Sequence, residues 1–138
     1  MIVKSITLDF FRNYPHLETS FSPDVNVICG ENAQGKTNLL EAIGYLSTAS
    51  SRRARYDREL IQFGVDHAFV KAEVFSRERD FTLEARLGRS VRRQLLSNGV
   101  KLKTAGELAG VLNTLFFCPE DLMLIREGAA ERRGFLDE

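Results

Sequence analysis

The sequence has few cysteines and no long apolar run. Its two cysteines, Cys29 and Cys118, lie in separate apolar segments, so neither a disulfide framework nor a cysteine zinc site is expected. A reducing, cytoplasmic setting agrees with this composition. No apolar stretch reaches the roughly 18 residues that a membrane-spanning helix needs, and the first residues lack the basic head and apolar core of a signal peptide. The sequence therefore predicts neither secretion nor a membrane span.

An excess of charge of one sign is also absent. The 138 residues contain 19 Lys and Arg against 19 Asp and Glu, so the chain has no bulk attraction to nucleic acid or to an anionic membrane. The distribution is uneven, because residues 52–103 carry 13 basic and 7 acidic side chains. With 43% hydrophobic residues, the chain is long enough to bury the core of one domain. Any binding of anions must therefore be local.

Hydrophobic periodicity predicts a mixed α/β order of strands and helices. Alternation and short apolar runs predict strands at residues 2–10, 17–21, 25–29, 67–75, 80–87, 94–97, 100–102 and 115–118. Helical signals predict a helix of about three to four turns from Lys36, a short turn at 58–63, a helix from Thr104 to Leu112 and another from Pro119. Asn98-Gly99 predicts a tight hairpin, and the apolar run 25–29 is typical of a strand covered on both faces.

The strongest functional signal is Gly30-Glu-Asn-Ala-Gln-Gly-Lys-Thr37, which fits the pattern G-x-x-x-x-G-K-[ST] between a predicted strand and a predicted helix. Glycines let consecutive backbone N–H groups wrap closely around a phosphate chain. The following helix directs its free N–H groups and its positive dipole end at the same anion. Lys36 supplies a mobile cation for the outer phosphates, and the Thr37 hydroxyl is suited to ligate Mg²⁺. The loop contacts phosphates and not the base, so ATP and GTP both fit it. The alternative to a nucleotide site is a glycine-containing turn that matches the motif by chance.

Several sequence blocks resemble those of the RecF family. They are Phe11-Arg-Asn-Tyr14, the phosphate loop with its helix through Ile43, and Phe117-Cys-Pro-Glu-Asp-Leu122. The similarity extends to Ser51-Arg-Arg53 and Arg132-Arg-Gly-Phe-Leu-Asp137, so it covers nearly all of the chain. The resemblance implies an α/β fold: a P-loop NTPase lobe of the ABC-ATPase type, similar to the heads of SMC and Rad50 proteins, with an antiparallel β-subdomain.

The family resemblance also implies a function. A RecF-like protein would bind ATP with Mg²⁺, form a head-to-head dimer on duplex or gapped DNA largely without reading its sequence, and release the DNA on hydrolysis. Its partners in recombinational repair, replication and the SOS response would be proteins of the RecR, RecO and RecA type, in the cytoplasm.

The same resemblance implies which residues would surround the nucleotide. The residues carried over onto the nucleotide site are Arg12, Asn13, Gly30, Asn32, Gly35, Lys36, Thr37 and Asn38. Lys36 would stabilise the charge of the phosphates, and Thr37 would hold Mg²⁺. For Arg12 and Asn13 the alternative is a solvated charge and a turn-initiating side chain.

Two groups of basic residues suggest contacts with a DNA backbone. Arg52, Arg53 and Arg55 follow the first helix, where related SMC heads carry an arginine loop, and Tyr56 and Arg58 lie beside them. The second group lies on predicted strands and their connections and comprises Arg86, Arg89, Arg92, Arg93, Lys101 and Lys103. For both groups an ordinary solvated surface is the alternative.

Several parts of a complete ATPase head are missing from the sequence. Phe135-Leu-Asp-Glu138 resembles the end of a Walker B strand, but the charged residues before it are typical of a helix, and no Ser-Gly-Gly signature segment occurs. The glutamine that senses Mg²⁺ in related heads is not present near Cys118, where Glu120 or Asp121 would have to replace it. We therefore expect residues 1–138 to be the N-terminal lobe of a longer ATPase, without its general base and with little or no turnover of its own.

Two other functions are compatible with the sequence. A small P-loop kinase or GTPase acting as a monomer would share the phosphate loop, although the Asn-Lys-x-Asp tetrapeptide of a GTPase does not occur. A non-enzymatic basic module that binds DNA or protein would use the phosphate loop only as a structural turn.

Overall fold

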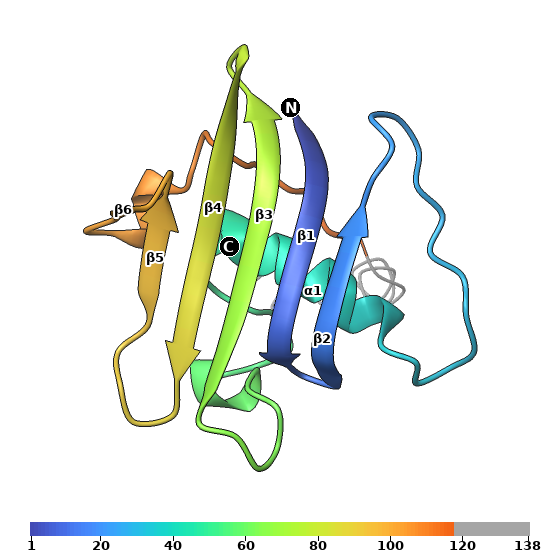
Figure 1. Ribbon diagram of the computed structural model, residues 1–138, viewed down its shortest axis with the longest axis vertical. Helices are drawn as coiled ribbons and strands as arrows, with labels where there is room; N and C mark the ends of the chain where they lie inside the picture. The colour runs from blue at the N-terminus through green and yellow to red at the C-terminus, as the bar shows by residue number, and fades with distance from the viewer. Residues whose placement is uncertain (118–138) are drawn as a thin grey trace, which may run out of the picture.

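A six-stranded antiparallel sheet with one α-helix against one of its faces makes up most of the computed structural model, which describes residues 1–117 (Figure 1). In spatial order the strands are β2 (Tyr14–Ser20), β1 (Ile2–Phe11), β3 (His67–Ser76), β4 (Arg79–Gly88), β5 (Gln94–Ser97) and β6 (Val100–Lys101). Every neighbouring pair is antiparallel. The predicted antiparallel strands before and after the first helix are confirmed, with bounds shifted by a few residues.

Alternating side chains divide the sheet into a buried and an open face. On β3, Ala68, Val70 and Val74 are buried, whereas Lys71 and Glu73 lie between them on the open face. Because successive side chains of a strand point to opposite faces, this alternation places the buried aliphatic residues on the side that the helix covers, whereas Phe69 and Phe75 lie on the open face. The sheet therefore supplies one wall of the core and leaves the other face to solvent.

The helix α1 (Lys36–Thr48) lies across the buried face of the strands, behind them in Figure 1. Leu39, Ala42, Tyr45 and Leu46 recur at helical spacing and are all buried. Burial of each large apolar side chain contributes about 1.5–3 kcal/mol, so this stripe fixes the helix against the sheet. The predicted helix after the glycine-rich segment is confirmed.

Two predicted strands are wrong. Residues 25–29 have no regular structure, and Val25 and Val27 are 81% and 79% exposed. Residues 115–117 are also irregular, with Leu115 at 94% exposure. A β-branched apolar run has a tendency to form a strand, but a strand also needs a partner that accepts its backbone hydrogen bonds. None of the described strands pairs with either segment.

The predicted turns are confirmed. Asn98 and Gly99 both have positive φ, of 51° and 76°, and join β5 to β6 as a tight hairpin. Thr104 and Glu107 form the predicted capping box, with the Thr104 amide donating to Glu107 Oε1 at 2.8 Å. The helix that follows is shorter than predicted, because it is the 3₁₀ turn η2 (Ala105–Glu107).

Other predictions fall outside the described residues. The helix from Pro119, the Mg²⁺-sensing alternatives Glu120 and Asp121, and the segment 135–138 all lie beyond residue 117. Within the described range, no helix is both long and apolar enough to pass through a membrane.

Candidate functional site

The phosphate loop ends at Gly35, the residue that leads into α1. Gly35 has a φ of 99°, in the left-handed region that side chains disfavour. A Cβ at this position would lie 2.6 Å from the amide atoms of the Asn13 side chain. The second glycine of the motif is therefore required both by its backbone conformation and by the close approach of the turn between β1 and β2.

The ammonium group of Lys36 lies over the loop. Its Nζ donates to the carbonyl oxygens of Gly30 at 2.5 Å and of Glu31 at 2.6 Å. An ammonium group has three N–H donors, so one remains for a further acceptor. The loop thus holds a cation at its centre, next to the first turn of α1, where the amide groups lack partners within the helix.

The turn between β1 and β2 brings two predicted residues beside the loop. Asn13 Nδ2 donates to the carbonyl of Gln34 at 3.2 Å, and Asn38 Nδ2 donates to Asn13 Oδ1 at 2.8 Å. Arg12 adopts a positive φ of 53°, and its backbone amide donates a hydrogen bond to the carbonyl of Leu60 at 2.7 Å. The predicted proximity of this turn to the phosphate loop is therefore present in the structure.

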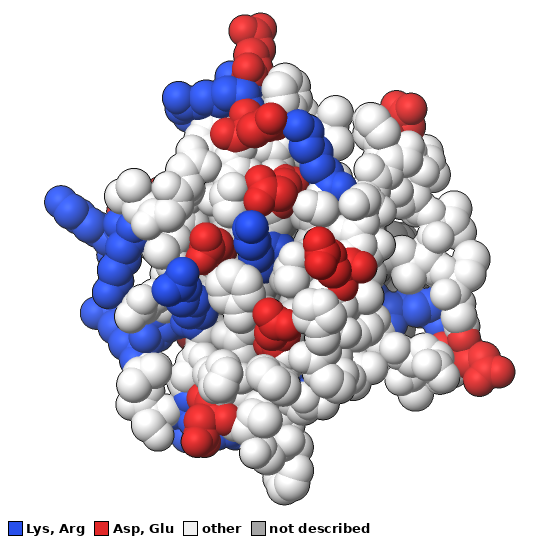
Figure 2. All heavy atoms as spheres, in the orientation of Figure 1, with Lys and Arg blue, Asp and Glu red and all other residues white. Residues whose placement is uncertain are grey.

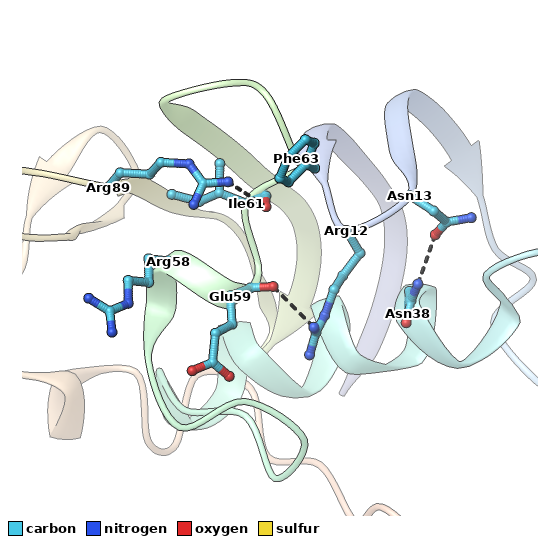
Figure 3. A pocket seen from close by; sticks show the side chains of 8 residues that line it. All are labelled: Arg12, Asn13, Asn38, Arg58, Glu59, Ile61, Phe63 and Arg89. Atoms are coloured by element: carbon cyan, nitrogen blue, oxygen red, sulfur yellow. Dashed lines mark hydrogen bonds between the residues drawn. The ribbon is translucent and has the colours of Figure 1, made fainter.

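An open cavity of about 540 Å³ lies next to these residues (Figure 3). It is lined by Arg12, Asn13, Asn38, Arg58, Glu59, Ile61, Phe63 and Arg89. The lining contains more cationic than acidic side chains, and the Phe63 ring is 98% exposed. Cations and an exposed aromatic ring beside a phosphate loop suit a ligand that combines an anionic group with a planar one.

Sequence reasoning missed Glu41, a buried acid on α1. Its side chain is 4% exposed and accepts two hydrogen bonds from Arg12, at 2.7 and 2.9 Å. It also accepts hydrogen bonds from Ser51 Oγ at 2.5 Å and from Arg53 Nη1 at 3.4 Å. The available signal was an acidic residue directly before the buried Ala42 in the amphipathic helix.

The predicted arginine loop lies after α1. Arg52, Arg53 and Arg55 are exposed, and Arg53 also donates to Asn38 Oδ1 at 2.9 Å, which ties it to the nucleotide-site candidates. Tyr56 stacks with the guanidinium groups of Arg55 and Arg58, 5.4 and 4.8 Å from its ring centre. The loop therefore presents arginines on a solvent-facing segment.

The second predicted basic group does not form one patch. Arg86 pairs with Glu84 at 3.0 Å on the open face of the sheet. Arg89 donates instead to the carbonyls of Val65 and Gln62, at 2.7 and 3.1 Å. Figure 2 shows acidic and basic side chains mixed over the open face of the sheet, with basic ones gathered at the edge where β5 and β6 lie.

Arg93 has an internal role that sequence reasoning did not anticipate. Its guanidinium donates to the carbonyl of Ala49, at the end of α1, at 2.7 Å and pairs with Asp57 at 3.1 Å. Burial, followed by the hydrogen bond to Asp57, raises the pKa of Tyr45 well above its usual range. For Arg93, burial lowers the pKa, but the contacts with Tyr45 and Asp57 outweigh it and raise the pKa overall. These contacts tie together the two ends of the arginine loop, residues 50–56, because Tyr45 and Ala49 precede the loop and Asp57 follows it.

The remaining predicted nucleotide neighbours are accessible. Gly30, Asn32 and Thr37 are exposed on the loop and at the first turn of α1. The described residues contain no group of three or more His, Cys, Asp or Glu side chains that would hold a metal alone. A Mg²⁺ ion at the Thr37 hydroxyl would therefore take most of its ligands from phosphate oxygens and water, as such ions commonly do.

Comparisons with known proteins agree with this geometry. Residues 5–123 match the model of the family described as AAA domain. The chain is 43% identical to the DNA replication and repair protein RecF of Lachnospira eligens and 40% identical to the protein of that name from Clostridium acetobutylicum. Each comparison covers 99% of this chain and 38% of the relative, so the chain spans less than half the length of these curated relatives.

Solved structures show the same similarity. A structure of the recombination mediator protein RecF-ATPrS in the RecFOR pathway has a TM-score of 0.90 and 39% identity, over 98% of this chain and 37% of that chain. A structure of SMC ATPases has a TM-score of 0.82 at 21% identity, over 99% of this chain and 98% of that chain, and so shares the fold. The expected α/β fold, a P-loop ATPase head lobe with an antiparallel β-subdomain, is confirmed.

Proposed function

Because the chain belongs to the AAA domain family and its resemblance to RecF proteins is confirmed over nearly its whole length, we propose that it forms the ATP-binding N-terminal lobe of a DNA replication and repair protein. The observation that carries the proposal is the phosphate loop itself. Its glycine at φ 99° leads into α1, and its lysine ammonium keeps one free donor at the loop's centre.

Specific residues would hold the nucleotide. The phosphates would lie on the loop amides and on Lys36, with Thr37 as a ligand of Mg²⁺. Arg12, Asn13 and Asn38 line the adjoining cavity, so the rest of the nucleotide would extend from the loop past these side chains toward Phe63. The likeness to RecF-ATP, a recombination mediator at 39% identity, supports ATP as the nucleotide.

Hydrolysis would require parts that the described residues do not supply. Lys36 and Mg²⁺ would stabilise the charge of the phosphates, but a carboxylate that orients water would have to come from another segment or chain. Little or no turnover is therefore expected of these 138 residues, and the full-length dimer would be the active ATPase. Steady ATP hydrolysis by the 138-residue chain alone, abolished by Lys36→Ala, would refute the expectation that these residues have little or no turnover of their own.

The resemblance to RecF proteins supports a wider role. The full-length protein would act in the cytoplasm, dimerise with ATP on DNA and help proteins of the RecR and RecO type to load a RecA-type recombinase during repair and the SOS response. The exposed arginine loop after α1 supports contact with a DNA backbone, which arginine side chains bind without reading bases.

A nucleotide titration tests the proposal. Labelled Mg·ATP should bind the full-length protein, and Lys36→Ala should remove most of that binding while the fold is kept. Binding that is insensitive to Lys36→Ala would favour the alternative, a basic binding module whose phosphate loop is only a turn.

A further inference from the structure

The buried carboxylate of Glu41 connects two arginines that come from different segments. Arg12 belongs to the turn between β1 and β2, and Arg53 belongs to the loop after α1. Both donate to this one carboxylate, which is 4% exposed, and Ser51 adds a further hydrogen bond. A carboxylate taken out of water is costly unless it is paired and hydrogen-bonded, and here both requirements are met.

The contact with Arg12 leaves part of that guanidinium free for another partner. Nε and Nη2 face Glu41 at 2.9 and 2.7 Å, and Nη1 donates to the carbonyl of Glu59 at 3.0 Å. A guanidinium has five N–H donors in a fixed plane, so three are engaged and two remain. Figure 3 shows this side chain extending along the cavity wall, so the carboxylate fixes the plane in which the remaining donors are presented.

Arg53 is held in a similar way by the same carboxylate. Its Nη1 bridges Glu41 and Asn38, at 3.4 and 2.9 Å. Glu41, Ser51 and Arg53 line a second cavity of about 590 Å³, which also reaches Leu115. The carboxylate thus lies between two cavities and holds one arginine at each.

The network continues to the phosphate loop. Asn38, which accepts from Arg53, donates to Asn13, and Asn13 donates to the carbonyl of Gln34 in the loop. An unbroken series of hydrogen bonds therefore runs from the loop backbone to the Glu41 carboxylate. A change in the position of that carboxylate would be transmitted to side chains that face the loop.

We propose that Glu41 is a positioning residue for nucleotide binding, a buried counter-charge that holds Arg12 and Arg53 in the orientation in which they meet an anionic ligand. This inference rests on the proposed function, because the ligand is the nucleotide bound at the phosphate loop. Glu41 itself would not touch the nucleotide. Its effect would pass through the two arginines, which distinguishes it from a carboxylate that merely supports the fold.

The test is a double-mutant cycle on Mg·ATP affinity in the full-length protein. Glu41→Asp keeps the charge but withdraws the carboxylate by one methylene, so the two-point contact with Arg12 is lost. We expect a loss of about ten- to hundredfold in affinity, the range of one or two charge-assisted hydrogen bonds. In a background of Arg12→Ala and Arg53→Ala, Glu41→Asp should cause little further loss, because the side chains through which it acts are gone.

Glu84→Asp provides the matched control. The Glu84 side chain pairs with Arg86 at 3.0 Å and is 14% exposed, but it lies on the open face of the sheet, so its shortening should leave ATP affinity unchanged. If Glu41→Asp does not fold, Glu41→Gln takes its place in the same cycle, because it keeps the length of the side chain.

The possible results distinguish a failure of the proposed nucleotide binding from a failure of the proposed role of Glu41. Absence of Mg·ATP binding by the unmodified protein would overturn the proposed function. Normal binding by that protein and equally tight binding by Glu41→Asp would overturn only the role of Glu41. Losses that simply add to those of the arginine variants would also overturn it, since they would show that Glu41 acts through general stability.

Discussion

The side chain of Asn13 occupies the space into which a Cβ on Gly35 would project, at 2.6 Å. The two residues are 22 positions apart in the sequence, yet they meet because the turn between β1 and β2 folds over the phosphate loop. Gly35 also has a φ of 99°. The phosphate loop and the turn that carries Arg12 are therefore assembled as one unit.

Gly35→Ala should disrupt this unit. The new Cβ would require both a strained backbone and a displaced Asn13, so we expect a loss of about 1–3 kcal/mol in the free energy of unfolding and weaker ATP binding. Urea denaturation and ATP titration measure the two effects. Gly44→Ala is the control, because a Cβ there meets nothing within 4 Å, and alanine in a helix should stabilise by about 0.5–1 kcal/mol. Equal effects of the two substitutions would contradict the close packing at Gly35.

Arg93→Ala distinguishes a structural arginine from a DNA-binding one. Arg93 was predicted to contact DNA, but it donates to Ala49 and pairs with Asp57. Removal of these contacts should lower the free energy of unfolding by about 1.5–3 kcal/mol, the range for hydrogen bonds to charged groups. The salt dependence of DNA binding should stay the same in a variant that remains folded. A flatter salt dependence without loss of stability would restore the DNA-binding role.

Tyr45 predicts a pH dependence in the alkaline range. Its folded pKa lies above its unfolded value of about 10, because burial and then the hydrogen bond to Asp57 disfavour the phenolate. The stabilising contribution is complete below that unfolded value and is lost as pH rises through the folded pKa, since the unfolded chain ionises first. Stability curves between about pH 8 and 11 should therefore fall more steeply for the unmodified chain than for Tyr45→Phe.

Tyr56→Phe is the control for that comparison. Tyr56 is 48% exposed, and its ring stacks with arginine side chains instead of packing in the core. This variant leaves the hydrogen bond between Tyr45 and Asp57 in place, so the alkaline fall in stability should remain. Parallel curves for the unmodified chain and Tyr45→Phe would show that the buried hydroxyl does not contribute in this way.

The arginine loop predicts a change in the salt dependence of DNA binding. Substitution of Arg52 and Arg55 by alanine in the full-length dimer should reduce the slope of log affinity against log salt by about 1–2, if each contacts one phosphate. Fluorescence anisotropy with a duplex at several salt concentrations measures the slope. Arg86→Ala is the control, because its guanidinium pairs with Glu84 on the open face of the sheet. An unchanged slope in the double variant would place the DNA elsewhere.

Local sequence patterns predicted most of the sheet. Alternation in segments such as 67–75 and 80–87 follows directly from the two-residue period of a strand with one buried face. The phosphate loop was also predictable, because its glycines and lysine must occupy fixed positions before a helix. These features depend on neighbours in sequence, so a single chain contains enough information to locate them.

Features that depend on distant residues were not predictable. Glu41 resembles any exposed acid on a helix until Arg12 and Ser51 are brought to it from other segments. Similarly, nothing in the sequence indicates that Arg93 reaches Ala49 instead of solvent. Residues 25–29 show the opposite error, because apolar β-branched residues indicate a strand but cannot supply the neighbour that it needs.

The most direct measurement is the affinity of the full-length protein for Mg·ATP before and after Lys36→Ala. Lys36 Nζ lies over the loop with one donor left for a phosphate oxygen, so we expect at least about a hundredfold loss with an unchanged circular dichroism spectrum. Lys71→Ala, on the open face of the sheet, should bind as tightly as the unmodified protein. Retention of full affinity by Lys36→Ala would contradict the assignment of this loop as the nucleotide site.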